Sequence, residues 1–148
     1  MIVLVFGSTV FLSAALLFTV EPMVAKALLP RLGGSASVWS TCLAFFQAAL
    51  LIGYGYAHVS SRLTSRWQAG LHLGLLVFCL VLHPAIIVGA GDRPPTSGAD
   101  PTIWLLLTLS KTIGLPFVML SSTSSMLQRW YAATRPPGEA DPYPLYGA

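Results

Sequence analysis

Between Thr102 and Leu127 the chain reads TIWLLLTLSKTIGLPFVMLSSTSSML, and this stretch decides its fold class. The stretch is apolar over more than the roughly 20 residues with which an α-helix crosses a bilayer. Lys111 is its single formal charge. Since an ammonium group inside a bilayer costs roughly 2.5 to 3.5 kcal/mol on insertion scales, we expect Lys111 to face protein or a water-filled cavity.

The composition of the whole chain is typical of a membrane protein. Of its 148 residues, 55% are hydrophobic and only 9% are charged, and its mean hydropathy is +0.73. A soluble domain averages about 25% charged residues. The net charge is +3 and the pI is near 9.1. The basic residues are scattered and form no patch, so nucleic acid is not expected as a partner. We predict an all-α, polytopic membrane protein whose first partner is the lipid bilayer.

Four apolar segments are long enough to cross a bilayer, and we predict a transmembrane four-helix region over residues 1–132. The spans cover about residues 2–29, 38–59, 69–90 and 102–127. The first span does not have the form of a secretory signal, because no basic residues precede it and no small-residue cleavage site follows it. Residues 133–148 contain four prolines and are predicted to form a connecting tail without a regular helix.

The distribution of basic residues indicates an orientation. With four spans, the N-terminus, the turn at residues 60–68 and the C-terminal tail share one side of the membrane. The basic residues of that side outnumber those of the other side; they are Arg62, Arg66, Arg129 and Arg135, against Lys26, Arg31 and Arg93. Because connections rich in Lys and Arg stay in the cytoplasm, we place both termini there, in a bacterial cytoplasmic membrane.

Glu21 is the only acidic residue in or beside the predicted spans, and we expect it to be the partner of Lys111. At about 1.5 Å of rise per residue, both residues lie roughly 12 to 14 Å below the same surface. An ion pair at this depth has two interpretations. It forms part of a functional polar cavity, or it only fixes the packing of two helices.

Further polar groups at this depth favour a hydrophilic path. Pro116 cannot donate to the carbonyl of Thr112, so it is expected to kink its helix and leave that oxygen as a ligand. Pro22 is expected to kink the first span in the same way. Ser121 opens a run of hydroxyl side chains, and Gln47 lies in the middle of the second span. The alternative is that the hydroxyls bond back to their own helix.

The third predicted span contains a small-residue motif and a possible ligand stripe. Gly70 and Gly74 form a GxxxG motif, which we assign to helix packing. His72, Cys79 and His83 fall within about 40° of one another on one helix face, which makes them weak candidates for a soft metal or haem. Because they spread over three turns and cannot all reach one ion, we assign no metal and no cofactor. No catalytic fingerprint of a soluble enzyme is present.

Two groups of motifs resemble a known family. The first group is Phe11-Leu12-Ser13 through Glu21, Gly33-Gly34, and Val38 to Gly55. The second and more specific group is Gly114-Leu115-Pro116-Phe117, Leu120-Ser121, Leu127-Gln128-Arg129-Trp130, Asp141-Pro142-Tyr143 and Leu145-Tyr146. Together they resemble the membrane region of the spermidine synthase-like fusion proteins, which is similar to the major facilitator superfamily. The resemblance implies that the first and fourth helices line a central cavity, and Glu21 and Lys111 are on these two helices.

The resemblance also sets a limit on catalysis. In that family the membrane helices continue beyond the Leu145-Tyr146 motif, and a soluble Rossmann-type domain similar to aminopropyl transferases commonly follows. This sequence lacks the synthase domain and ends at Ala148. We therefore expect a fragment, a split gene product or a shortened relative that is not an enzyme by itself.

These observations favour a membrane module of transporter-like type, with Glu21 and Lys111 in the wall of a polar cavity for a small or charged solute. Four helices would need a second copy or another membrane subunit to complete a translocation path. Two alternatives stay open. One is a non-catalytic accessory or scaffold subunit of a larger membrane complex, and the other is the membrane half of a split polyamine synthase-like protein.

Overall fold

The computed structural model describes residues 2–32, 35–89 and 101–134, without the side chains of residues 29, 31 and 82–89. In these ranges the chain is helical apart from short turns and caps, and no strand is present, so the all-α prediction is confirmed. The helices are α1 (Ile2–Leu32), α2 (Ala36–Ser60), α3 (Ser65–Gly89), α4 (Pro101–Leu109) and α5 (Leu115–Ala133), with the π-helical turn η1 (Ser110–Gly114) between α4 and α5.

Three of the four predicted spans are confirmed as helices that are long and apolar enough to cross a membrane. They are Ile2–Leu28, Ala36–Ser60 and the continuous rod Pro101–Ala133. In α3 the described apolar part, Ser65–Val81, is shorter than a crossing. The third span is therefore a helix where it was expected, while its crossing of a membrane stays a prediction.

The two prolines expected to kink their helices lie in different local structures. α1 continues without interruption past Pro22 and ends at Leu32. The fourth span is interrupted at η1, directly before Pro116. Because proline has no N–H for the carbonyl four residues earlier, the regular α-helical bond to Thr112 cannot form there. The irregularity expected at Pro116 thus takes the form of a π-helical turn, in which the carbonyls bond five residues ahead.

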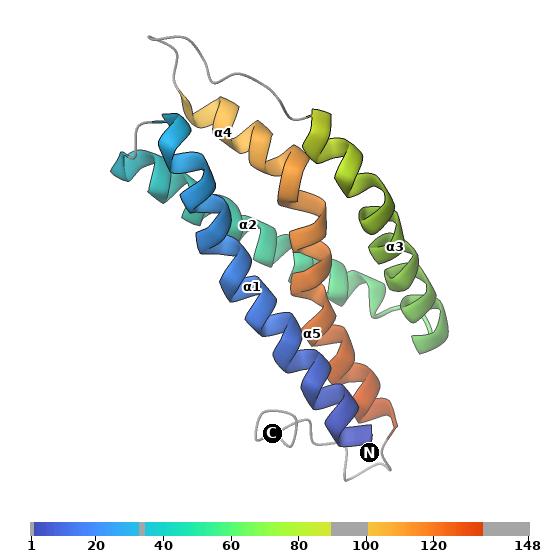
Figure 1. Cartoon of the computed structure of the whole chain (residues 1–148). Helices are drawn as coiled ribbons and strands as arrows, with labels where there is room; N and C mark the ends of the chain where they lie inside the picture. The colour runs from blue at the N-terminus through green and yellow to red at the C-terminus, as the bar shows by residue number, and fades with distance from the viewer. Residues whose placement is uncertain (1, 33–34, 90–100, 135–148) are drawn as a thin grey trace.

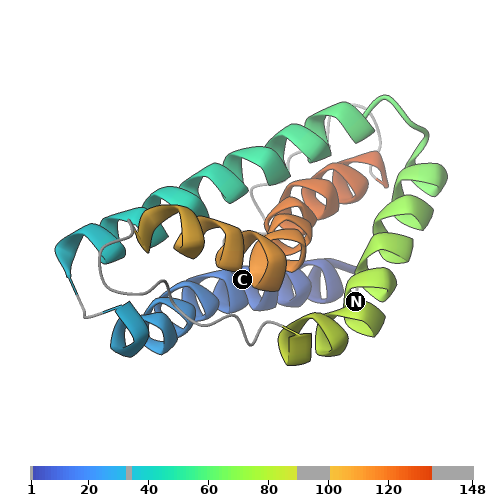
Figure 2. The same ribbon diagram turned by 90° about the horizontal axis from the view of Figure 1, so that it is seen from above.

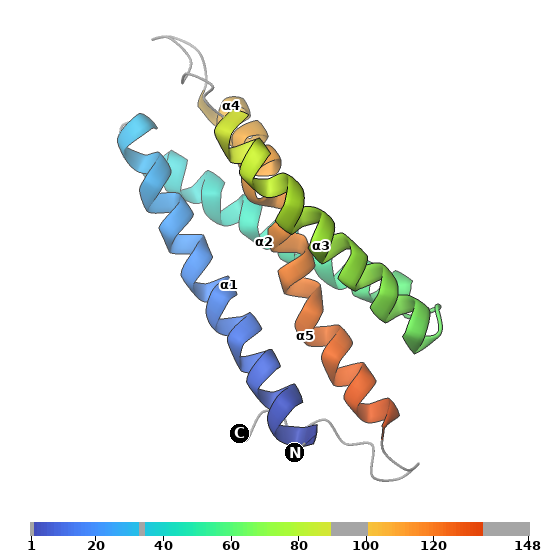
Figure 3. The same ribbon diagram turned by 45° about the vertical axis from the view of Figure 1, so that its right-hand side comes forward.

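The rod formed by α4, η1 and α5 lies at the centre of the arrangement. Figure 1 shows α5 between α1 and α3, with α2 crossing behind it, and Figure 3 shows the same flanking of α5 by α1 and α3. Seen from above, α1 and α2 lie on opposite sides of α4 (Figure 2). α5 contacts α1, α2 and α3, whereas α3 packs mainly on α5 and η1. The central rod therefore holds the other three helices together.

The apolar core lies where α1, α2 and the central rod meet. Its buried members are Ala25, Leu28, Val38, Cys42, Phe46, Ala49, Leu105, Leu109 and Phe117. The rings of Phe46 and Phe117 pack at a centroid separation of 4.8 Å. At the opposite end of the bundle, the ring of Phe6 lies 5.6 Å from that of Tyr131, so α1 begins where α5 ends. The core therefore occupies one end of the bundle and leaves space between the helices further along.

Close helix packing occurs at a glycine other than the two predicted. A Cβ built on Gly70 or Gly74 has no neighbour within 4 Å, and both residues are exposed, so neither packs two described helices together. A Cβ built on Gly53 would instead overlap Ser121 Oγ and lie 2.9 Å from the carbonyl oxygen of Val118. The closest approach of α2 to α5 therefore depends on Gly53, because a glycine lets two backbones meet.

Candidate functional site

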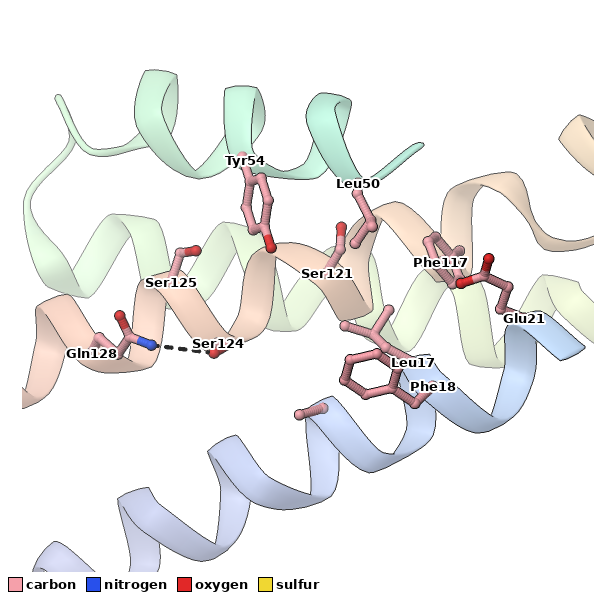
Figure 4. A pocket seen from close by; sticks show the side chains of 11 residues that line it. Leu17, Phe18, Glu21, Leu50, Tyr54, Phe117, Ser121, Ser124, Ser125 and Gln128 are labelled. Atoms are coloured by element: carbon pink, nitrogen blue, oxygen red, sulfur yellow. Dashed lines mark hydrogen bonds between the residues drawn. The ribbon is translucent and has the colours of Figure 1, made fainter. Parts of the chain in front are cut away.

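A cavity of about 420 Å³ lies between α1, α2 and α5, on the side of the core that faces the start of α1. Its wall is formed by Ala14, Leu17, Phe18, Glu21, Leu50, Tyr54, Phe117, Ser121, Ser124, Ser125 and Gln128. Figure 4 shows Glu21 and Gln128 at the two ends of this set, with Tyr54 and the serines between them. The cavity is therefore polar along α5 and apolar along α1, apart from one carboxylate.

Among the residues that the structure describes, Glu21 is the only charged one in this wall. It is placed there by helical periodicity, because Ala14, Leu17 and Phe18 share its face of α1 at spacings of three, four and seven residues. Its side chain is partly exposed, and no hydrogen bond or ion pair joins it to another side chain in the described part of the chain. The carboxylate is thus available to a bound group.

The polar side of the cavity is one face of α5, defined by Ser121, Ser124, Ser125 and Gln128. Ser121 Oγ donates to the carbonyl of Val118 at 2.9 Å, and Gln128 Nε2 donates to Ser124 Oγ at 3.4 Å. The hydroxyls of this run bond largely within their own helix, as one of the two sequence interpretations expected. A hydroxyl oxygen that has donated its proton still accepts, so this face presents acceptors to a solute.

Of the polar residues predicted from the sequence, the structure brings Glu21 and Ser121 together in one cavity wall. Thr112 and Gln47 lie outside this wall. The hydroxyl of Thr112 donates to the carbonyl of Thr108 at 2.7 Å within the rod, and Gln47 is exposed on α2 next to the buried Phe46. The polar side chains that the structure gathers in the cavity wall therefore lie mainly along α5.

The position of Lys111 in the structure differs from the predicted one. Its side chain is exposed on η1 and outside the cavity wall, and no ion pair joins it to Glu21 among the residues that the structure describes. The predicted depth of Lys111 is a distance along the helix axis, and it does not include the direction of the side chain around that axis. Leu109, two residues earlier, is fully buried in the core. Residues two apart point about 200° away from each other around a helix axis, so Lys111 faces outward.

A second polar cluster, which the sequence did not predict, fixes α3 to its neighbours. Gln68 is only 1% exposed; its Nε2 donates to Ser60 Oγ at 3.1 Å, and its Oε1 accepts from Trp130 Nε1 at 2.9 Å. One turn further along α3, His72 Nε2 lies 3.0 Å from Thr123 Oγ1. A glutamine near the start of an apolar helix and a tryptophan near the end of another were the available signals.

The histidine and cysteine stripe on α3 has a structural role in the described part of the chain. His72 is buried against Thr123, and Cys79 is buried as a free thiol. The side chain of His83 lies outside the described residues. In residues 2–32, 35–89 and 101–134, no three His, Cys, Asp or Glu side chains gather as a metal site would require. His72 therefore serves to dock α3 on α5.

Comparisons of this chain with protein-family models, with curated proteins and with solved structures found no match.

Proposed function

We propose that this chain is a multi-pass membrane protein of transporter-like type, and that it holds a small hydrogen-bonding cation in the cavity between α1, α2 and α5. The observation that supports this proposal is the carboxylate of Glu21, the single charge that the described residues contribute to a wall otherwise formed by hydroxyl, amide and apolar groups. A carboxylate in such a wall attracts a cation, and the serine oxygens accept from its N–H or O–H groups.

The outer surface of the helices supports the membrane part of the proposal. Large apolar side chains are exposed along every long helix, including Leu4 at 67%, Phe11 at 73%, Leu51 at 72%, Leu80 at 76% and Ile103 at 66%. Surfaces of this extent on a water-soluble monomer would drive association. In a bilayer the same side chains contact lipid, and the backbone bonds are satisfied within the helices.

The number of membrane crossings and the orientation of the chain are also part of the proposal. α1 and α5, which belong to the first and fourth predicted spans, both line the cavity, as a facilitator-like arrangement requires. We propose four crossings with both termini in the bacterial cytoplasm, and a second copy or another subunit that completes the path. The likeness to the spermidine synthase-like fusion proteins, and with it a split polyamine synthase, rests on the sequence motifs alone.

Binding of methylammonium to the full chain in detergent, measured by calorimetry, tests the cation site. A hydrogen bond to a charged group contributes about 1.5 to 3 kcal/mol, so Glu21→Gln is expected to weaken binding by roughly ten- to one-hundredfold. Gln47→Leu is the matched control, because Gln47 is exposed and outside the cavity wall. Equal binding of formate, an anion of similar size, or unchanged binding in Glu21→Gln would contradict the proposal.

A second candidate function is that of an accessory subunit in a larger membrane complex. It is favoured by the exposed Gly70 and Gly74 on α3, a small-residue surface onto which another membrane helix could pack closely. Replacing both glycines by leucine should dissociate such a complex in native electrophoresis of the membranes, while Gly55→Leu, at another open position, should not. Migration of the unaltered chain as a monomer would rule this function out.

A further inference from the structure

A second cavity, also of about 420 Å³, adjoins the first between the end of α2, the start of α3 and the end of α5. The two cavities share Tyr54 and Ser125 in their walls. The other residues of the second wall are Ala57, His58, Ser61, Gln68, Met126 and Arg129. The predicted site residues of the sequence include none of these.

The charge of this second cavity is opposite to that of the first. Arg129 contributes a guanidinium group, which stays protonated in proteins, and no Asp or Glu of the described residues is in the wall. Arg62 and Arg66 are exposed in the adjoining turn and at the start of α3, which makes this end of the bundle basic. A cavity with such a wall favours an anion.

The wall also offers donors in a fixed arrangement. Gln68 is 1% exposed and is held by Ser60 and Trp130, and its second Nε2 hydrogen is still available to a ligand. The hydroxyl of Ser61 is engaged, because it donates to the carbonyl of His58 at 2.6 Å. Arg129, Gln68 and His58 therefore supply the donors, and a planar guanidinium binds two oxygens of a phosphate at once.

The position of the cavity at the ends of three helices identifies the source of the anion. The indole of Trp67 is 75% exposed at this level, and Trp130, which donates to the neighbouring residue Gln68, is partly exposed. Tryptophans are enriched at the level of lipid headgroups, and basic pockets between membrane helices bind anionic headgroups. We propose that the second cavity binds the phosphate of an anionic phospholipid. This inference rests on the membrane-spanning part of the proposed function and is independent of the cation at Glu21.

Titration of the full chain in detergent with short-chain phosphatidylglycerol, followed by tryptophan fluorescence and by lipid adducts in native mass spectrometry, tests the site. Arg129→Gln is expected to weaken binding by at least about tenfold, the loss that follows removal of a charged hydrogen-bond partner. Arg66→Gln removes an equal charge outside the wall and should have little effect. His58→Ala, which removes a donor that lines only the second cavity, should cause a smaller loss, and it tests the site if Arg129→Gln does not fold.

The outcomes separate the possible sources and the two proposals. Phosphatidylglycerol binding that depends on Arg129, with weak binding of phosphatidylcholine and inorganic phosphate, supports the inference. Inorganic phosphate that binds as tightly as the lipid overturns the lipid assignment, and equal losses in Arg129→Gln and Arg66→Gln overturn the site. Glu21→Gln should leave phosphatidylglycerol binding unchanged, so failure of the cation site and failure of the lipid site are distinguishable.

Discussion

At the residue scale, Glu21 and Lys111 act independently because they point in different directions. Glu21 lines the cavity, and Lys111 is exposed on η1. A double-mutant cycle with Glu21→Gln and Lys111→Ala should therefore give a coupling energy below about 0.5 kcal/mol in the free energy of unfolding. The cycle subtracts the change in the free energy of unfolding that Lys111→Ala causes by itself. A coupling well above 1 kcal/mol would show that the two charges interact after all.

Gly53 gives a second prediction at this scale. A methyl group at this position would overlap Ser121 Oγ and press on the carbonyl of Val118, so Gly53→Ala should destabilise the protein by roughly 1 to 3 kcal/mol. Gly55→Ala is the matched control, since no described atom beyond the adjacent backbone of α2 lies within 4 Å of the added carbon and alanine favours a helix. Thermal unfolding of the two variants in one detergent measures the difference. Equal stability would mean that α2 and α5 are not in close contact.

Single residues also mark what the sequence predicts and what it does not. The depth of Glu21 and its exceptional charge are readable from the sequence, because hydropathy and helical rise fix the position along a span. The direction in which a side chain points around the helix axis is not readable from the sequence, since most faces of a membrane helix are equally apolar. The charge and depth of Lys111 and the amide of Gln47 predict interior positions, and the structure places both residues outside the cavity wall.

At the element scale, the docking of α3 depends on two hydrogen bonds of Gln68, one donated to Ser60 and one accepted from Trp130. Gln68→Leu would leave the partly buried N–H of Trp130 without its acceptor and remove the donor to Ser60. An unsatisfied buried group costs about 1 to 3 kcal/mol, so α3 should open more often than α1. Hydrogen exchange should then rise selectively in α3, and the exposed Gln47→Leu should not change it. Uniform exchange in all helices would contradict this role.

The sequence predicts where the helices lie along the chain, and it predicts the form of their interruptions less well. Four apolar runs correspond to the helical segments α1, α2, α3 and α4 through α5. The π-helical turn at η1 precedes Pro116, whose missing donor is readable from the sequence, and η1 contacts α3 in the structure. Pro22 lacks the same donor, and α1 nevertheless continues, because a helix in an apolar surrounding keeps its remaining backbone bonds.

At the scale of the whole molecule, the helices pass up and down the bundle, and α1 begins near the end of α5. Single cysteines at Thr64 and Thr134, in a chain with Cys42 and Cys79 replaced by alanine, should react with an impermeant maleimide from one side of the membrane. A cysteine at Ser35 should react only from the other side. Reaction of Ser35→Cys and Thr64→Cys from the same side would contradict the crossing of α2.

The most direct test of the proposed cation site measures whether the cavity between α1, α2 and α5 is accessible to water and selects cations through Glu21. Ser124→Cys, in the same cysteine-free background, is treated with a cationic and an anionic methanethiosulfonate of equal size. The cationic reagent should react faster, and Glu21→Gln should lower the ratio of the two rates by about tenfold, since the carboxylate acts on both reagents at short range. A ratio of the two rates that does not change in Glu21→Gln, or a thiol that neither reagent reaches, would contradict the proposed cation site.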